Sequence, residues 1–193
     1  FRFPLDYGNQ RPLSASWTVT GSGAFALGLN QKCRAHITGM TPGRIVDYGL
    51  KDSMNMGACM APAAADTVAR HMEDFHVTPE EYDRIITGDL GSVGQTVLID
   101  LLREKGIDIA DRHMDCGIEI FDAEAQDTHA GGSGCGCSAV TLAAYVLPKL
   151  ESGEWKKVLF LPTGALLSKT SFNEGKSVPG IAHAVVLESP AVK

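Results

Sequence analysis

The sequence has no excess of positive charge and no long apolar run, and each absence excludes a class of protein. Seventeen Lys and Arg residues stand against 23 Asp and Glu residues, which gives a net charge of −6. Proteins that bind nucleic acid use a basic patch for the phosphates, so we expect no nucleic-acid partner. No segment approaches the roughly 20 apolar residues of a membrane span, and the opening FRFPLDYGNQ has no signal-peptide pattern. The expected protein is therefore cytoplasmic and not secreted.

The sequence also lacks a cysteine pattern typical of disulfides or of a zinc site. The number of cysteines is odd, and they lie in apolar surroundings: Cys33, Cys59, Cys116, Cys135 and Cys137. This pattern favours reduced, buried thiols in an intracellular protein. Cys135 and Cys137 have no second pair to complete the ligands of a structural zinc site, so we predict no metal site. We expect both side chains to fill a crowded turn as small apolar groups.

An initiating methionine and any linker, repeat or low-complexity tract are missing too. The chain begins with Phe1, and residues 17–29 (WTVTGSGAFALGL) already have the composition of a strand. We therefore expect a piece of a longer protein. A chain of 193 residues can bury about 70% of its extended surface. One domain over residues 1–193 is the expectation.

Apolar periodicity predicts strands and helices in alternation. Helical spacing marks residues 62–75, with Pro62 in the first turn, and residues 93–105. Thr78 begins a short capped turn with Glu81 as its partner. Strands are expected at 16–20, 23–29, 35–48 (broken near Pro42), 83–88, 115–122, 158–162 and 181–188, with a polar loop at 168–179. This order is typical of an α/β fold, a parallel or mixed sheet with helices on both faces.

The most informative stretch is a glycine-rich turn at 131–138 that leads into an apolar helix. From Ser138 to Leu147 the helix is apolar nearly all round, so it must be covered on both sides. Its glycines either expose N–H groups that hold an anion at the helix start or only permit tight packing. Both interpretations stay open. The candidate ligand-binding residues of this turn are Gly132, Ser133, Gly134, Cys135, Gly136 and Cys137.

Several stretches resemble a known family. Residues 115–122 (DCGIEIFD), 128–168 (THAGGSGCGCSAVTLAAYVLPKLESGEWKKVLFLPTGALLS) and 174–188 (EGKSVPGIAHAVVLE) resemble the stage V sporulation protein AD family, thiolase-like proteins of endospore-forming bacteria. WTVTGSGAFALG is similar to the last strand region of the family's first half. The resemblance therefore implies that residues 1–30 end a first half that is otherwise absent, and that the rest is the C-terminal half.

The resemblance implies a fold and a function. The fold is one βαβαβαββ half, a five-stranded mixed sheet with helices on both faces and a central helix that stacks against the other half. The function is non-catalytic binding of dipicolinic acid within the SpoVA complex, which moves dipicolinate into the developing spore. The implied partners are other SpoVA subunits at the spore inner membrane and the chain's own N-terminal half or a second copy. The protein would lie in the forespore, peripheral to that membrane, and would need no cofactor, although calcium could arrive with dipicolinate.

The resemblance also bears on catalysis. Thiolase-like enzymes take a reactive cysteine from the first half and a His with an Asn or second His from the second half. The corresponding loops here, at 87–92 and 131–138, contain neither histidine nor asparagine. We therefore expect no catalytic residue. The alternatives are an acyltransferase that acts on acyl-CoA and a purely structural scaffold.

Three more polar residues are candidates for the dipicolinate site. His129 precedes the glycine turn and could contact the ligand or its calcium, or could simply be solvated. Asp89 could bind calcium or cap the following helix. Lys169, in the polar loop, could pair with a ligand carboxylate or lie at the surface. Among other residues we expect Cys116 and His183 to belong to strands in the core. Without a covering half, the helix face around Val140, Leu142, Tyr145 and Val146 would be exposed and would drive association.

Overall fold

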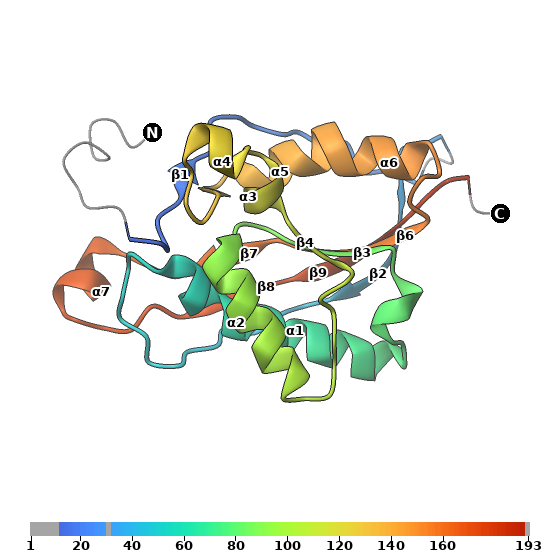
Figure 1. The fold of residues 1–193 in the computed structure, drawn as a ribbon. Helices are drawn as coiled ribbons and strands as arrows, with labels where there is room; N and C mark the ends of the chain where they lie inside the picture. The colour runs from blue at the N-terminus through green and yellow to red at the C-terminus, as the bar shows by residue number, and fades with distance from the viewer. Residues whose placement is uncertain (1–11, 30–31, 192–193) are drawn as a thin grey trace.

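A mixed sheet forms the centre of the computed structural model, which describes residues 12–29 and 32–191 (Figure 1). Its strands lie in the order β2 (His36–Thr41), β9 (Ala184–Glu188), β6 (Lys157–Leu161), β3 (Arg84–Thr87) and β4 (His113–Asp115). β3 is parallel to both β4 and β6, whereas β9 is antiparallel to β6 and β2. The predicted α/β class and five-stranded mixed sheet are confirmed.

Two helices cover one face of the sheet, α1 (Met56–Phe75) and α2 (Gly91–Arg103). They cross at glycines: a Cβ on Gly94 would lie 2.8 Å from the backbone of Gly57. The core between these helices and the sheet contains Val68, Leu98, Leu102, Ile85, Leu159 and Leu161. The close crossing brings the start of α2 against the start of α1, where the candidate site described below opens.

The start of α1 differs from the sequence expectation. The helix begins at Met56, so Pro62 is buried inside it and does not lie in the first turn. Asn55 sets this earlier start, because its side chain accepts a hydrogen bond from the Ala58 N–H. The short turn at η1 (Pro79–Glu81) is confirmed, with the Thr78 and Glu81 capping box.

The glycine-turn helix lies on the opposite face of the sheet, and helices on both faces are thus confirmed. It runs through α5 (Cys137–Thr141), a π-helical turn η2 (Leu142–Val146) and α6 (Leu147–Glu151). Val146 and Leu150 are fully buried against Val158 and Phe160 of β6. The expectation that Val146 is uncovered was wrong, because Val146 packs toward the sheet. Tyr145 is exposed as expected, as is Ala144, whereas Val140 and Leu142 are half-buried.

The π-helical turn comes just before Pro148. A proline in a helix donates no hydrogen bond, and its ring crowds the carbonyl four residues earlier. That carbonyl belongs to Ala144, within η2. The wider turn therefore lies where proline disturbs the regular helical ladder.

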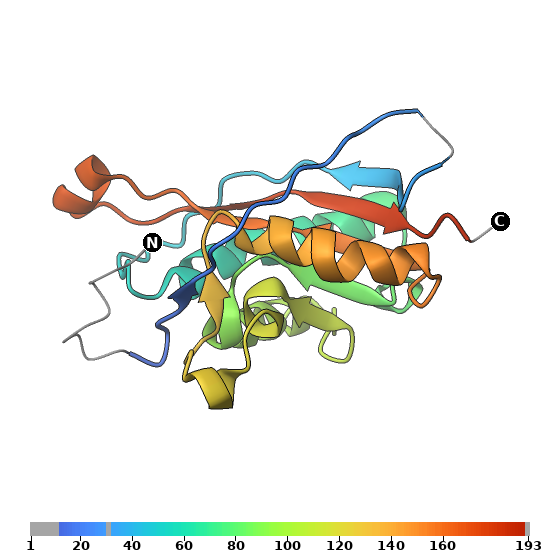
Figure 2. The ribbon, with the colours of Figure 1, turned by 90° about the horizontal axis from the view of Figure 1, so that it is seen from above.

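Residues 17–29 form much less strand than the composition predicts. Only β1 (Trp17–Thr18) is a strand, parallel to β5 (Gly132–Ser133) in the glycine turn. From Gly21 onward the segment crosses the outer side of the central helix (Figure 2). A Cβ on Gly23 would lie 2.8 Å from the carbonyl oxygen of Ala139, which shows how closely the two backbones approach. Residues 1–11 and 30 of the expected first-half segment lie outside the described residues.

Residues 115–122 were predicted as a strand, and this was wrong. β4 ends at Asp115, and the short helices α3 (Cys116–Glu119) and α4 (Ala123–Gln126) follow. The cause is the Asp115 side chain, which accepts the Gly117 N–H and caps α3. Cys116 is fully buried as expected, but at a helix start and not within a strand.

The expected last strand, residues 181–188, is divided into β8 (Gly180–Ala182) and β9. β8 pairs antiparallel with the short strand β7 (Thr163–Ala165). The helix α7 (Lys169–Asn173) interrupts the predicted polar loop between them. His183 lies between β8 and β9. It is exposed, contrary to the core position expected, and its ring Nδ1 accepts the Gly43 N–H. The main order, apart from these short additions, is the expected βαβαβαββ.

Candidate functional site

A cavity of about 730 Å³ opens at the end of β3, where the start of α2 and the glycine turn meet. Its walls come from residues between 12 and 17, between 53 and 60, 89 and 90, between 128 and 135, and 163 to 165. Ligands of α/β proteins favour this place, the crevice beyond the carboxyl ends of the strands. The volume lies within the roughly 300–1,000 Å³ of typical small-molecule sites.

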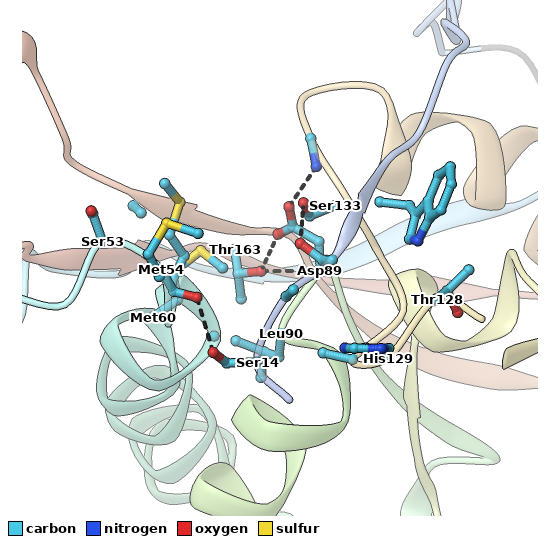
Figure 3. A pocket seen from close by; sticks show the side chains of 18 of the residues that line it. Ser14, Ser53, Met54, Met60, Asp89, Leu90, Thr128, His129, Ser133 and Thr163 are labelled. Atoms are coloured by element: carbon cyan, nitrogen blue, oxygen red, sulfur yellow. Dashed lines mark hydrogen bonds between the residues drawn. The ribbon is translucent and has the colours of Figure 1, made fainter. Parts of the chain in front are cut away.

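The cavity walls combine apolar and hydroxyl side chains. Figure 3 shows Met54 and Met60 on one side, Thr128 and His129 on the other, and Asp89 between them. Trp17 and Leu90 add apolar surface. The hydroxyl groups come from Ser14, Ser16, Ser53, Ser133, Thr128 and Thr163. Such walls suit a small, partly apolar molecule that carries a few polar groups.

The glycine turn owes its shape to both conformation and close packing. Gly131 and Gly134 have φ angles of +114° and +119°, a region that other residues avoid. A Cβ on Gly136 would lie 2.4 Å from the carbonyl oxygen of Gly21. The packing interpretation of these glycines therefore holds at Gly136, whereas Gly134 faces the cavity.

Asp89 occupies the N–H group that the turn would offer to an anion. Its Oδ2 accepts the Gly134 N–H at 3.0 Å, and its Oδ1 accepts the Thr163 hydroxyl at 3.0 Å. The Asp89 N–H in turn donates to Thr163 Oγ1. The carboxylate thus ties the end of β3 to the glycine turn and to β7, and it is not the cap of α2.

A second carboxylate, Asp115, caps that helix. It is 1% exposed and accepts the N–H groups of Leu90, Gly91 and Gly117. The Thr87 hydroxyl donates to it as well, at 2.6 Å. Asp115 therefore fixes the loop that carries Asp89, directly beneath the cavity.

The structure brings part of the predicted residue set together. Asp89, His129, Ser133, Gly134 and Cys135 line the cavity. The ring of His129 lies between two acceptors, the Pro12 carbonyl at 3.1 Å from Nδ1 and Asp127 Oδ1 at 3.4 Å from Nε2.

The other predicted residues lie outside the cavity lining. Gly132 pairs with Trp17 in the β1–β5 ladder, and Gly136 is buried against Gly21. Cys137 is fully buried, and its thiol donates to the Gly88 carbonyl. Lys169 lies on the exposed first turn of α7.

Burial governs the ionisation of the groups beneath the cavity. It raises the pKa of the Cys137 thiol to about 12, and the Asp89 and Asp115 carboxylates act in the same direction. The pKa of Cys116 is raised for the same reasons. Burial also lowers the pKa of His113 to about 4, although Asp115 opposes this shift. Both thiols and this imidazole are therefore neutral at pH 7.

Sequence reasoning missed several residues of the site. Asp115 was assigned to a strand, Thr163 was given no role, and the methionines before and within α1 showed no recognisable spacing. Residues 12–17 reach the cavity only because β1 pairs with the glycine turn. The one available signal for Thr163 was PTGALLS (residues 162–168), the end of the second stretch that resembles the family.

Within residues 12–29 and 32–191, no group of three or more His, Cys, Asp or Glu side chains is arranged to hold a metal ion. Of the helices in this same part of the chain, none has the length and apolar character needed to cross a bilayer.

A family model and a curated relative match the chain over almost the same residues. The family model of stage V sporulation protein AD matches residues 1–188. Stage V sporulation protein AD of Bacillus subtilis (strain 168) is 43% identical over 188 residues, covering 97% of this chain and 55% of the relative. The chain thus spans about half the length of this curated relative.

Two solved enzyme structures are among those with a similar arrangement. Human mitochondrial 3-ketoacyl-CoA thiolase matches 81% of this chain and 30% of its own, with a TM-score of 0.42 and 15% identity. The 3-oxoacyl-[acyl-carrier-protein] synthase III of Aquifex aeolicus VF5 matches 81% of this chain and 46% of its own, with a TM-score of 0.43 and 15% identity.

Proposed function

Because this chain belongs to the stage V sporulation protein AD family, we propose that it binds dipicolinic acid as a non-catalytic part of the complex that moves dipicolinate into the developing spore. The cavity at the glycine turn is the proposed binding site. The ligand is a planar pyridine ring with two carboxyl groups. It therefore needs apolar surface for the ring and donors for the carboxyl oxygens.

The observation that carries this proposal is the match between the cavity and such a ligand. About 730 Å³ leaves ample room for one small aromatic ring. Trp17, Leu90 and the methionine side chains offer apolar contact, and methionine sulfur packs well against aromatic rings. Of the cavity hydroxyls, those of Ser14 and Thr163 already donate within the protein, whereas Ser53 and Thr128 can donate to carboxyl oxygens. The site thus supplies both kinds of contact.

The cysteines of the glycine turn support a non-catalytic role. A thiol acts as a nucleophile when it is ionised, and ionisation needs a cationic or basic neighbour. Cys137 has the opposite surroundings, because burial and two carboxylates raise its pKa to about 12. Cys135 is exposed in the cavity wall. It is therefore the thiol on which the acyltransferase alternative depends.

The proposal includes partners and a location. We propose that the protein works at the spore inner membrane, from the forespore side, through other SpoVA subunits. Exposed apolar side chains on the segment that crosses the central helix, among them Leu27 and Leu29, offer a surface for the chain's own first half or for a second copy. We propose no cofactor, apart from calcium that the ligand can carry.

Isothermal titration calorimetry tests the proposal. Dipicolinic acid, with and without calcium chloride, is titrated into the folded chain and into two tryptophan variants. Ser53→Trp places an indole in the cavity wall and should weaken binding at least tenfold. Ala144→Trp, on the exposed side of the central helix, is the matched control and should bind like the wild type. Equal binding by both variants would place the ligand elsewhere.

Mass spectrometry after incubation with acyl-CoA distinguishes non-catalytic binding from the acyltransferase alternative. The proposal predicts no stable mass increase on any cysteine. A thioester on Cys135, lost in Cys135→Ser, would contradict the non-catalytic assignment and favour an acyltransferase.

A further inference from the structure

We propose that a second cavity binds a small diamino acid, with Arg84 as the partner of its carboxylate and with Asp111 and Glu119 as the partners of its two ammonium groups. This cavity of about 260 Å³ lies between the central helix and the starts of β3 and β4. Its volume is just below the roughly 300–1,000 Å³ of drug-sized sites, which favours a ligand of amino-acid size. It shares no described lining residue with the cavity at the glycine turn, so this inference does not depend on the proposed function.

Arg84 is held in place by an indole ring. It is half-buried at the start of β3, and the central carbon of its guanidinium lies 5.7 Å from the ring centre of Trp155, which is only 8% exposed. The Lys149 ammonium lies over the same ring at 5.2 Å. Cations at such distances are attracted to the electron-rich face of an indole. The guanidinium is therefore positioned before a ligand arrives, which lowers the cost of ordering it on binding.

The cavity wall carries three charged side chains without a charged partner. Within the described part of the chain, Arg84 forms no ion pair, and its one side-chain hydrogen bond goes to the Asp83 carbonyl at 2.8 Å. In that same part, the carboxylates of Asp111 and Glu119 take part in neither an ion pair nor a hydrogen bond. Because no ion pair joins Arg84 to either carboxylate, space remains between the opposite charges for the groups of a ligand. The guanidinium keeps free donors, and the carboxylates keep free acceptor oxygens.

The other ionisable groups of the wall that bear on charge add nothing to this balance. Lys149 and Glu154 form an ion pair with each other. His113 also lines the cavity, but burial lowers its pKa to about 4, so its ring is neutral at pH 7. The unpartnered set is thus one positive and two negative groups. A diamino acid carries the opposite set, one carboxylate and two ammonium groups, and charge-assisted hydrogen bonds between such groups are the strong ones.

Nuclear magnetic resonance tests this inference through the two tryptophans of the chain. Trp155 lines the second cavity and Trp17 lines the cavity at the glycine turn, so their indole N–H signals report on the two sites separately. The variant Trp17→Phe assigns the signals. The probe is L-lysine, and two analogues each lack one group. One is 1,5-diaminopentane, without the carboxylate, and the other is 6-aminohexanoate, without the α-ammonium group.

We expect L-lysine to shift the Trp155 signal saturably, to leave the Trp17 signal unchanged, and to bind at least fivefold more tightly than either analogue. Arg84→Gln should weaken L-lysine binding at least fivefold, and Glu119→Gln should weaken it at least threefold, because each removes the partner of one ligand charge. Lys169→Gln removes an exposed positive charge outside this cavity. It is the matched control for Arg84→Gln and should bind like the wild type.

Each of the following results would overturn the inference. Equal affinity of the wild type for L-lysine and 1,5-diaminopentane would mean that no carboxylate is recognised, and equal affinity for 6-aminohexanoate would remove the second ammonium group. Neither comparison needs a variant. Wild-type affinity of a folded Arg84→Gln variant would remove Arg84 as the partner.

The position of the shifts decides the rest. A shift of the Trp17 signal alone would place the ligand in the cavity at the glycine turn, and no shift of either signal at millimolar L-lysine would refute the second site. In every case the binding of dipicolinic acid is tested separately, by the calorimetry described above.

Discussion

Asp115 is the residue on which the geometry beneath the cavity depends most. It is buried, and four donors converge on it: the Thr87 hydroxyl and the N–H groups of Leu90, Gly91 and Gly117. A buried carboxylate is costly unless its oxygens are fully hydrogen-bonded, and here they are. Removing it leaves several buried donors without an acceptor.

We predict that Asp115→Ala lowers the free energy of unfolding by about 3 kcal/mol or more. The loss comes from unsatisfied N–H groups at the starts of α2 and α3. Urea denaturation followed by circular dichroism measures it, with the exposed Asp100→Asn as a control that should change stability by less than about 0.5 kcal/mol. A change in Asp115→Ala as small as in the control would show that the described hydrogen bonds contribute little.

His113 gives the protein an acid-sensitive group. Its ring accepts from Gln95 at Nδ1 and lies 2.9 Å from the Thr87 hydroxyl at Nε2, and burial lowers its pKa to about 4. In the unfolded chain the pKa of histidine is about 6.5. Between these two values the unfolded state binds a proton that the folded state does not. The stabilising contribution is therefore complete above pH 6.5 and is lost as the pH falls toward 4.

We accordingly predict that stability falls by up to about 1.4 kcal/mol per pH unit from this group between pH 6.5 and 4. His113→Gln should have a flatter stability profile over that range, whereas the exposed His36→Gln should keep the wild-type slope. Chemical denaturation at a series of pH values checks this. Parallel profiles for wild type and His113→Gln would contradict the assignment.

Among the elements, the central helix and the glycine turn were the most predictable. Their glycine and apolar pattern is local, and it requires a tight turn and two covered sides whatever the neighbours are. The start of α1 and the end of β4 were not predictable in the same way. Asn55 caps a helix that begins six residues before Pro62. Asp115 ends β4 by capping α3, but its side chain is held there by Thr87 of β3 and Gly91 of α2, which are distant in the sequence.

The close packing of the glycine turn leads to a prediction for Gly136. In Gly136→Ala the new Cβ would lie 2.4 Å from the Gly21 carbonyl oxygen, so the crossing segment has to move away from the helix. We expect a loss of about 1–3 kcal/mol in the free energy of unfolding.

Gly28→Ala is the matched control, because a Cβ there meets no atom within 4 Å. It should leave stability nearly unchanged. Thermal denaturation of both variants makes the comparison, and equal melting temperatures for the two would show that the close approach of residues 21 and 136 is not maintained in solution.

For the whole molecule, the α/β class and the helices on both faces of the sheet followed from the alternation of elements, but the cavity did not. The cavity joins parts of the chain more than 100 residues apart, such as Ser16 and Ser133, whose hydroxyls lie 2.7 Å apart. No local pattern records such a meeting. The sequence predicted Asp89 from its place after a strand and His129 from its place just before the glycine turn. The contribution of residues 12–17 and 53–60 to the cavity could be seen only in the folded chain.

The surface predicts how the chain behaves in solution. Leu27 is 82% exposed and Leu29 fully so, and Tyr145 of the central helix is 40% exposed. We predict self-association through the apolar segment that carries Leu27 and Leu29, which the double variant L27E/L29E should reduce. Ile45→Glu, at an exposed position elsewhere, should not reduce it. Multi-angle light scattering measures the mass, and a monodisperse wild-type monomer would count against this surface as an interface.

The most direct test of the central claim, that dipicolinic acid occupies the cavity at the glycine turn, is a map of backbone amide chemical shifts during titration with the ligand. The account predicts saturable shifts at Gly134, Ser133 and Ala165, which line the cavity, and unchanged positions at Lys169 and Gly28, which do not. Shifts confined to residues away from the cavity, or none at millimolar ligand, would contradict it.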